Sequence, residues 1–279
     1  MPRLVNRPWL AMIGGEMVFS KGFERRFGWM AFPGFLRYFA LLHVLVYVLR
    51  IARPGIGVLL MWDRGSIQAG EAWRVVTFLF ASSGFGQFNS MGMIFMVFMV
   101  MIAFMISDAL EAAWGVFKTS MFYYCGILGL IVANFFNPVW VMPFDGMFLY
   151  EAAFFAFATL FPRVEFRLFF ILPVQVRFLA ILGGLGLISP VFRNPMWLLF
   201  MLLIFANYLL WAGIPAMRGM ARVVKAGKRR ERFHAAKADA QNAFHRCEVC
   251  GKNDVTDPHE EFRVGPDGHE YCEDHLDAH

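Results

Sequence analysis

Three long stretches of this sequence hold no charged residue, and they constrain the fold more than any other feature. The uncharged runs are Val75–Ser107, Thr119–Phe144 and Asn194–Met217. Each is longer than the roughly 20 helical residues that cross the hydrocarbon core of a bilayer. A segment inside lipid must satisfy its own backbone hydrogen bonds, so each run is expected to contain a helix. The sequence therefore predicts an all-α polytopic membrane protein.

The composition agrees with this fold class. The chain has 279 residues, of which 58% are hydrophobic and 17% charged, whereas a soluble domain carries about 25% charged residues. Three weaker apolar segments bring the predicted transmembrane helices to six, at about 36–52, 90–107, 117–136, 146–161, 172–189 and 195–215. Small residues would let these helices approach closely, and the candidates are Gly126, Gly129, Gly183, Gly184 and Gly186.

Basic residues predict the orientation and the division of the chain. They gather before the first span, between the fourth and fifth spans at Arg163 and Arg167, and after the sixth span from Arg218 onward. Because basic loops stay on the cytoplasmic side, both termini are predicted to be cytoplasmic. The first loop, with four arginines between residues 50 and 89, opposes this orientation.

Four segments follow from these patterns. Residues 1–34 are expected to form an amphipathic cytoplasmic lead-in on the membrane, and 35–217 the six-helix membrane domain. A basic juxtamembrane linker is expected at 218–240, and a small module at 241–279.

The basic run KAGKRRERFHAAK, residues 225–237, could contact nucleic acid or anionic lipid. We favour membrane lipids and expect no nucleic-acid partner, since such runs routinely fix topology.

The polar C-terminal segment carries a metal-site pattern. Cys247 and Cys250 form a C-x2-C pair, and Cys272 and His275 form a C-x2-H pair after a spacer of 21 residues. Two such pairs can supply the four ligands of tetrahedral Zn²⁺, and Gly251 suits the tight bend after the first pair. A set of four protein ligands leaves no open position, so the predicted zinc is structural. A module this small would depend on the metal to fold.

Some alternatives at this site stay open. His269 is the second choice for the fourth ligand, followed by His245 and His279. A disulfide between two of the three cysteines would suit an oxidising compartment, which the predicted cytosolic location disfavours. The remaining cysteine, Cys125, falls in the third predicted span and is expected to be a buried apolar residue.

Three segments of the membrane part carry a family resemblance. They are GEAWRVVTFLF from Gly70, LEAAWG from Leu110, and ATLFPRVEF with LPVQVRFLA from Ala158. Together they make the chain, over about 35–218, similar to the rhomboid family of six-helix membrane proteins. Within these motifs we expect Trp73, Arg74 and Glu111 to serve as separate anchoring and packing residues.

The catalytic residues implied by the resemblance are missing. Active rhomboids cleave peptide bonds inside the membrane with a serine on helix four and a histidine on helix six. The serine position falls near Met147, and the chain has no serine from Met121 to Ile188. Asn207 or Tyr208 falls near the histidine position. Acyl transfer needs both the nucleophile and its base, so we expect no protease activity from these positions.

Glu151 is the acid in the fourth predicted span. An intramembrane carboxylate is a functional candidate by default, but Asp145, six residues earlier, would lie on a different helix face. We expect a structural role for Glu151: a protonated side chain, a cap for the first turn, or a bond to Asn134, Tyr123 or Asn207.

These patterns lead to one favoured function and two alternatives. The favoured function is a non-catalytic rhomboid-like membrane pseudoprotease that binds transmembrane segments or partner proteins, with the zinc module as a cytoplasmic contact surface. The first alternative is an intramembrane peptidase that uses unrecognised catalytic groups. The second is a transporter, although polar residues are sparse in the predicted spans: Glu151, Asn134, Asn207 and His43.

Overall fold

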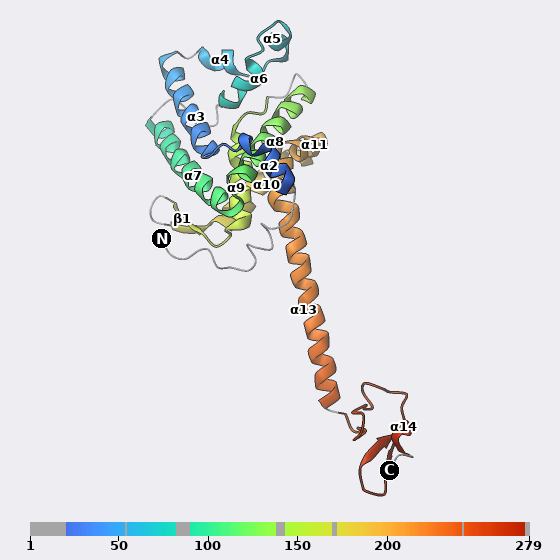
Figure 1. The fold of residues 1–279 in the computed structure, drawn as a ribbon. Coiled ribbons are helices and arrows are strands. Elements are labelled where there is room, and N and C mark those ends of the chain that lie inside the picture. Colours follow the sequence, from blue (N-terminus) through green and yellow to red (C-terminus); the bar gives the residue numbers. More distant parts are fainter. Residues whose placement is uncertain are drawn as a thin grey trace. The chain divides into compact units, whose positions relative to one another are not determined.

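The computed structural model describes residues 21–53, 55–81, 90–137, 143–168, 172–241 and 243–276. The described chain is mostly helical and divides into two compact units, Met1–Met217 and Arg218–His279 (Figure 1). Most of the predicted N-terminal lead-in, residues 1–20, lies outside the described residues. The part that is described forms the short helices α2 (Lys21–Phe27) and η1 (Gly28–Met30).

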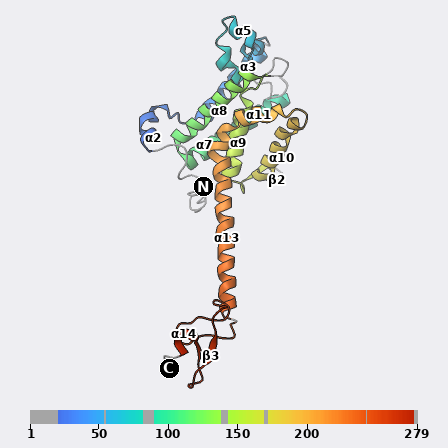
Figure 2. The ribbon, with the colours of Figure 1, turned by 90° about the vertical axis from the view of Figure 1, so that its right-hand side faces the viewer.

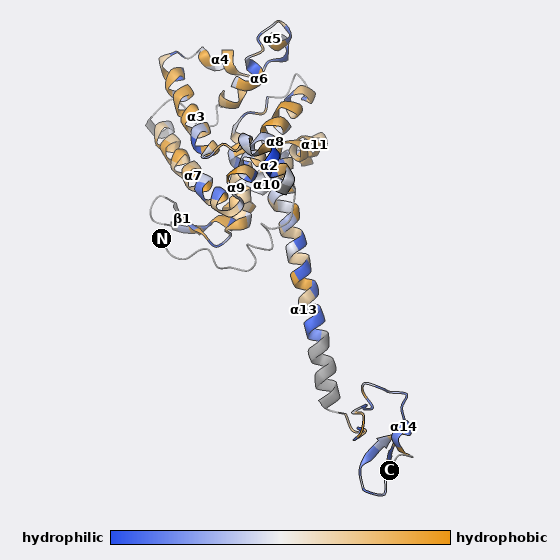
Figure 3. Ribbon diagram, in the orientation of Figure 1, coloured by the Kyte–Doolittle hydropathy of each residue, from blue (hydrophilic) through white to orange (hydrophobic). Residues whose placement is uncertain are grey.

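The first unit is built from apolar helices joined by short segments. Its longer helices are α3 (Phe35–Ala52), α7 (Ser90–Trp114), α8 (Val116–Phe136), α9 (Met147–Leu160), α10 (Val176–Ile188) and α11 (Met196–Ile204). Figure 3 shows that hydrophobic residues dominate α3, α7 and α8. Many large apolar side chains are exposed, such as Leu45, Ile94 and Leu182, which is 69% exposed. A surface of this kind is typical of helices that face lipid rather than water.

Three helical stretches are long and apolar enough to cross a membrane: Gly22–Ala52, Gly92–Trp114 and Val116–Phe136. The pair Met196–Ile204 and Ala206–Glu231, bent by 60° at Phe205, makes a fourth if it is counted as one span. These helices indicate a membrane protein. Among the described residues, α9 and α10 are apolar but have only 14 and 13 residues, about 20 Å of helix each. The count of six spans therefore stays a prediction.

Helix α9 lies at the centre of the first unit. It contacts α7, α8, α10, α12 (Ala206–Tyr208) and the π-helical turn η4 (Leu209–Gly213). Its buried face carries Ala152, Ala153 and Ala156, each at most 1% exposed. These small side chains let the surrounding helices approach the α9 backbone.

Close helix contacts occur at two of the predicted glycines. A Cβ atom on Gly129 would lie 2.4 Å from the Leu203 carbonyl oxygen, and one on Gly126 would lie 2.6 Å from Asn207 Nδ2. The expectation of close contact is wrong for Gly184 and Gly186, where an added Cβ meets nothing within 4 Å. Those two glycines lie on a helix, α10, that packs on one side only: most of its side chains are exposed.

The first loop is a folded segment of short helices. It contains α4 (Ile56–Leu60), α5 (Arg64–Gln68), α6 (Arg74–Thr77) and η2 (Phe78–Phe80). Arg74 is 6% exposed. Its Nη1 donates to the carbonyls of Val58 at 2.7 Å and Met61 at 2.9 Å, and its Nε to Glu71 at 2.5 Å. One buried guanidinium thus ties the short helices together.

Glu111 anchors a different region. Its Oε1 accepts a hydrogen bond from the backbone N–H of Gly34 at 2.7 Å. One turn earlier, Asp108 forms an ion pair with Arg37. Both contacts fix the start of α3 against the end of α7. Arg74 and Glu111 therefore have separate partners, as the sequence predicted.

The second strand of a β-hairpin occupies the start of the fifth predicted span. Strands β1 (Glu165–Leu168) and β2 (Leu172–Gln175) pair antiparallel, with Glu165 opposite Gln175. Helix α10 begins directly after β2 and contacts α9 (Figure 2). The 3-10 turn η3 (Ser189–Phe192) then leads toward α11. The predicted helix start at residue 172 is therefore wrong by four residues.

Helix α13 (Ile214–Gln241) begins in the first unit and continues into the second. The rest of the second unit contains the hairpin β3 (Phe262–Val264) and β4 (Glu270–Cys272), followed by the one-turn helix α14 (Glu273–Leu276). Its apolar core is small. Cys247, Tyr271 and Cys272 are buried, with Phe262 and Leu276 packed against them.

Candidate functional site

The first two candidate ligands lie on a tight turn. Cys247 and Cys250 bracket this turn, and the backbone N–H of Gly251 donates to the Cys247 carbonyl at 2.9 Å. Gly251 has a φ of 72°, a conformation that glycine adopts without the steric cost a side chain would bring. The turn directs both sulfur atoms toward one point.

The other two ligands come from the end of the hairpin. Cys272 is the last residue of β4, and His275 lies three residues later on α14. The backbone N–H of Glu248 donates to the Glu270 carbonyl at 2.9 Å, which joins the first turn to β4. This bond brings the two halves of the site together across the 21-residue spacer predicted from the sequence.

The four predicted ligands form one cluster. Cys247, Cys250, Cys272 and His275 each offer a ligand atom within 4.8 Å of the others. Cys250 Sγ lies 3.7 Å from Cys272 Sγ, and Cys272 Sγ lies 3.2 Å from His275 Nδ1. Sulfur atoms around a tetrahedral zinc are about 3.8 Å apart, because Zn–S bonds are about 2.3 Å long. The spacing is compatible with a metal site.

The same distances exclude a disulfide in this structure. All three cysteines of the cluster have free thiols. The 3.7 Å between Cys250 Sγ and Cys272 Sγ is far longer than a disulfide bond of about 2.05 Å. The sulfur atoms lie at the separation of two ligands of one ion.

Burial and backbone donors set the protonation of the thiols. Burial would raise the pKa of Cys247, but hydrogen bonds from the backbone of Cys250, Cys272 and Val249 outweigh it and hold the pKa at about 6. Burial, together with the neighbouring Cys247 and Cys250, raises the pKa of Cys272 to about 11. A metal ligand must be a thiolate. Cys247 is thus prepared for a cation, and Cys272 would lose its proton when the ion binds.

The alternative histidines lie away from the cluster. His245 Nδ1 is 3.0 Å from Glu270 Oε1, and this carboxylate raises the pKa of the imidazole. The side chain of His269 is exposed in the β3–β4 turn, where its backbone N–H donates to Asp267 at 3.2 Å. His279 lies outside the described residues. Of the histidines that the structure describes in this unit, only His275 is part of the cluster.

Several supporting residues were not predicted from the sequence. Lys252 forms ion pairs with Glu260 and with Asp274, the latter at 3.2 Å. Asn253 is buried, and its Oδ1 accepts from the N–H of Thr256 at 2.7 Å and of Val255 at 3.0 Å. This Asx turn could have been predicted, because Asn followed by Asp and Thr is a typical turn sequence. The ion pairs carry no local sequence signal.

In the membrane unit, the residue before the position expected for a serine is tightly packed. Gly146 precedes the first residue of α9, and a Cβ atom on it would lie 2.0 Å from the Leu79 carbonyl oxygen. The next residue, Met147, donates its N–H to Asp145 Oδ1 at 2.9 Å. Asn134 holds the approaching chain by donating to the Phe144 carbonyl at 2.8 Å and accepting from its N–H at 2.9 Å. The start of α9 is therefore clamped against neighbouring backbone.

Asn207, at the position expected for a histidine, is also tightly packed. Asn207 is fully buried. Its Nδ2 donates to the Phe122 carbonyl at 3.3 Å, and its Oδ1 accepts from the N–H of Tyr208 at 2.8 Å. Asn207 Nδ2 and Leu149 Cδ1 both lie 2.6 Å from where a Cβ of Gly126 would be. Leu149 of α9 and Asn207 thus both pack against α8 at Gly126, and a carboxamide cannot take a proton as an imidazole does.

Glu151 does not make the contacts predicted for it. Asn134 and Asn207 are engaged with backbone groups, and Asp145, rather than Glu151, caps the first turn of α9. Glu151 Oε2 is buried with no hydrogen-bond partner among the described residues. The expected cap and the expected bonds to Asn134, Tyr123 and Asn207 are therefore wrong, whereas a protonated Glu151 stays a prediction.

Comparison of the chain with protein-family models, with curated proteins and with solved structures finds no match.

Proposed function

We propose that the first unit is a rhomboid-like membrane pseudoprotease that binds transmembrane segments or partner proteins without cleaving them. The observation that carries this proposal is Met147, which places a thioether at the position expected for the serine nucleophile, with its backbone N–H bound to Asp145 Oδ1 at 2.9 Å. A thioether has no proton to give up, so it cannot serve as the nucleophile of acyl transfer. Asn207 adds support, since it offers an amide where a base is needed.

The order of the elements supports the family resemblance. A first helix precedes a loop of short helices tied by Arg74, and two long helices follow. A short central helix, α9, comes next, followed by the β1–β2 hairpin, α10 and a bent final pair. The six-span count belongs to this proposal. It requires α9 and α10 to cross although each helix alone is about 10 Å short of the hydrocarbon thickness.

The second unit would serve as a zinc-stabilised contact module. We propose Zn²⁺ because three sulfur ligands and one imidazole match its preference, and because a complete set of four suits a structural role. The basic residues of α13 would hold the preceding segment against anionic lipid on the cytoplasmic side. Both termini would then be cytoplasmic, and partners would meet the module there.

Reconstituted protein tests the absence of proteolysis. Liposomes containing the full chain and a panel of fluorescent single-span substrates should give no cleavage, and a fluorophosphonate probe should label no serine. A photo-crosslinkable transmembrane peptide should nevertheless be captured. Cleavage in the wild type that Glu151→Gln abolishes would identify a carboxylate-dependent peptidase and overturn the proposal. Capture of no peptide from the panel would contradict the binding role.

A further inference from the structure

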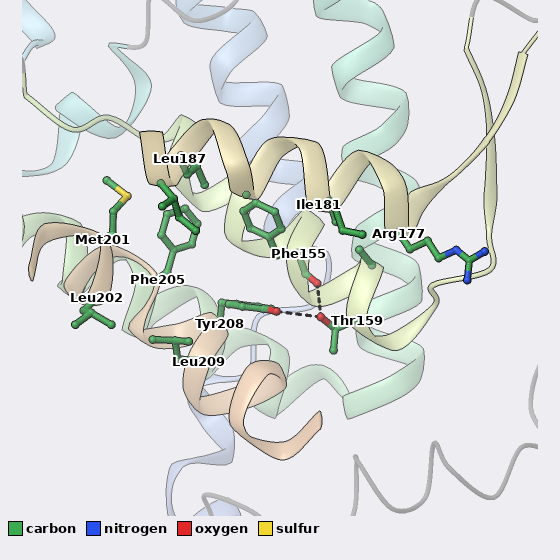
Figure 4. A pocket seen from close by; sticks show the side chains of 14 residues that line it. Phe155, Thr159, Arg177, Ile181, Leu187, Met201, Leu202, Phe205, Tyr208 and Leu209 are labelled. Atoms are coloured by element: carbon green, nitrogen blue, oxygen red, sulfur yellow. Dashed lines mark hydrogen bonds between the residues drawn. The ribbon is translucent and has the colours of Figure 1, made fainter. Parts of the chain in front are cut away.

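A groove of about 510 Å³ opens along α10 in the first unit. Its walls come from α9, α10, α11, α12 and η4, as the labelled side chains in Figure 4 show. Most lining residues are apolar, including Phe155, Ile181, Leu187 and Phe205. The volume is in the range of sites that hold a small ligand, about 300–1,000 Å³.

The middle of the groove has no free hydroxyl donor to offer a ligand. Its two hydroxyls bond to one another, with Thr159 Oγ1 lying 3.2 Å from Tyr208 Oη. Thr159 Oγ1 also donates to the Phe155 carbonyl at 2.8 Å (Figure 4). A hydrogen-bond acceptor would find no partner here, and most of the lining is apolar, so the chemistry favours a hydrocarbon.

The two ends of the groove differ in charge. Arg177 lies at one end, where α10 begins, and Leu187 and Met201 lie at the other (Figure 4). Arg177 is the one charged lining residue, and its guanidinium lies over the Phe178 ring at 4.7 Å. The described residues place no carboxylate within 4.0 Å of it.

A second cation lies near the same end. The backbone N–H of Val176 donates to the Val164 carbonyl at 2.9 Å. This bond brings the exposed Arg163 beside the start of α10. Glu165, the acid in this region, is in contact with Gln175 Nε2 at 3.5 Å. The end of the groove therefore carries more positive than negative charge and suits an anion.

The size of the groove distinguishes between two possible occupants. A spanning helix of about 20 residues and 10 Å diameter occupies more than about 2,000 Å³, which is more than the groove can enclose. A single acyl chain is far thinner. The outer face of α10 carries exposed Leu182 and Leu185, so a lipid could enter the groove directly from the bilayer.

We infer that this groove binds one acyl chain of an anionic phospholipid, with the lipid phosphate at Arg177 and the chain running past Thr159 toward Leu187. This inference concerns a lipid site and does not depend on whether the unit binds or cleaves transmembrane segments. It also places the headgroup at the loop that the positive-inside rule assigns to the cytoplasmic leaflet, where anionic lipids are enriched.

Two glycines on α10 provide a matched test. Gly184 lines the groove and Gly186 does not, and an added Cβ meets nothing within 4 Å at either position. Gly184→Leu should therefore fill the groove, whereas Gly186→Leu adds the same side chain to the same helix outside it. Both variants should keep the wild-type melting temperature in detergent.

The experiment uses full-length protein in nanodiscs with equal amounts of phosphatidylserine and phosphatidylcholine. In one sample the phosphatidylserine carries a diazirine in its acyl chain, and in a second sample the phosphatidylcholine does. Mass spectrometry of the wild-type protein should place the crosslinks in residues 155–159, 177–188 and 201–209, with phosphatidylserine preferred. Gly184→Leu should abolish these crosslinks and Gly186→Leu should retain them. Crosslinks spread evenly over α3, α7 and α10 in the wild type would overturn the inference, whatever the two variants show.

The arginine is tested by a second pair. Arg177→Ala should lower the preference for phosphatidylserine over phosphatidylcholine about fivefold, as expected for one basic contact with an anionic lipid. Arg193→Ala removes an exposed arginine at the far end of α10 and should leave the preference unchanged. Equal preference in the wild type would refute the headgroup assignment. A transmembrane peptide displaced by Gly184→Leu, with lipid crosslinks intact, would assign the groove to a protein segment instead.

Discussion

At the scale of single residues, the candidate metal centre depends on four side chains, two of which also pack in the core of the second unit. Cys247 and Cys272 are also most of the buried core of the second unit. A ligand substitution therefore removes both a metal bond and a packing contact. This double role distinguishes these cysteines from Cys125, which lies on α8 in the first unit and is not part of the cluster.

Replacement of one ligand should release the metal. We expect one zinc per chain in the wild type, and Cys272→Ser should lower this to a small fraction and unfold the second unit, because metal binding is the main source of its stability. Elemental analysis gives the zinc content, and amide hydrogen exchange reports the folding of residues 243–276. Cys125→Ser should retain the full zinc content. Folded, metal-free wild-type protein would contradict the prediction.

The contact at Gly146 gives a second residue-scale prediction. Gly146→Ala should lower the free energy of unfolding of the membrane unit by about 1–3 kcal/mol, because the new methyl group overlaps the Leu79 carbonyl and forces the backbone apart. Gly186→Ala should instead be neutral or stabilising by up to about 1 kcal/mol. Thermal unfolding in detergent measures both. Equal stability of the two variants would mean that the start of α9 has more room than the structure gives it.

At the scale of elements, the first loop depends on one buried guanidinium. Arg74→Lys keeps the charge but cannot reach both carbonyls and Glu71 with one ammonium group. We expect a loss of about 2 kcal/mol, since hydrogen bonds to charged groups contribute about 1.5–3 kcal/mol. Faster proteolysis within residues 55–77 should accompany the loss. The matched Arg53→Lys, at an exposed position, should change neither measurement.

The sequence predicts a helix end well where local charge sets it, and poorly where a partner far away in the chain sets it. The absence of charge located α8 correctly, but the first uncharged run also included Val75 to Phe80. These residues belong to short helices of the loop. The predicted end at residue 107 was too early, because Asp108 and Glu111 continue α7 by pairing with Arg37 and Gly34. Such partners lie far away in the sequence and leave no local signal.

The hairpin depends on a pairing partner elsewhere in the chain, whereas the metal ligands follow a local spacing. Apolar residues before α10 were predicted to be helical, yet β2 forms because β1 supplies a pairing partner. Periodicity alone does not distinguish short apolar strands from helices. The four ligands, in contrast, were recognisable because metal spacing is a local property of the chain. The roles of Glu151 and Asn207 depended on tertiary neighbours, and here the sequence was uninformative.

At the scale of the whole molecule, the two compact units should respond differently to metal removal. A chelator acts on the candidate cluster in the second unit, whereas the first unit is stabilised by apolar packing around α9. We therefore expect chelation to abolish exchange protection in residues 243–276 and to leave the thermal unfolding of the membrane unit unchanged. Re-addition of Zn²⁺ should restore the protection. A shift in the unfolding of both units would show that the metal stabilises the membrane helices as well.

The π-helical turn η4 has a consequence for the polar contacts of the last bent segment. A π turn accommodates one residue more than an α turn, so it resets the phase of the helix between Tyr208 and Ile214. If the same five residues wound as a regular α-helix, the extra residue would rotate one side of the turn by about 100° against the other. Asn207 would then turn away from Phe122, or Tyr208 from Thr159. The π winding of this turn, more than the identity of its residues, keeps both side chains in register with their neighbours.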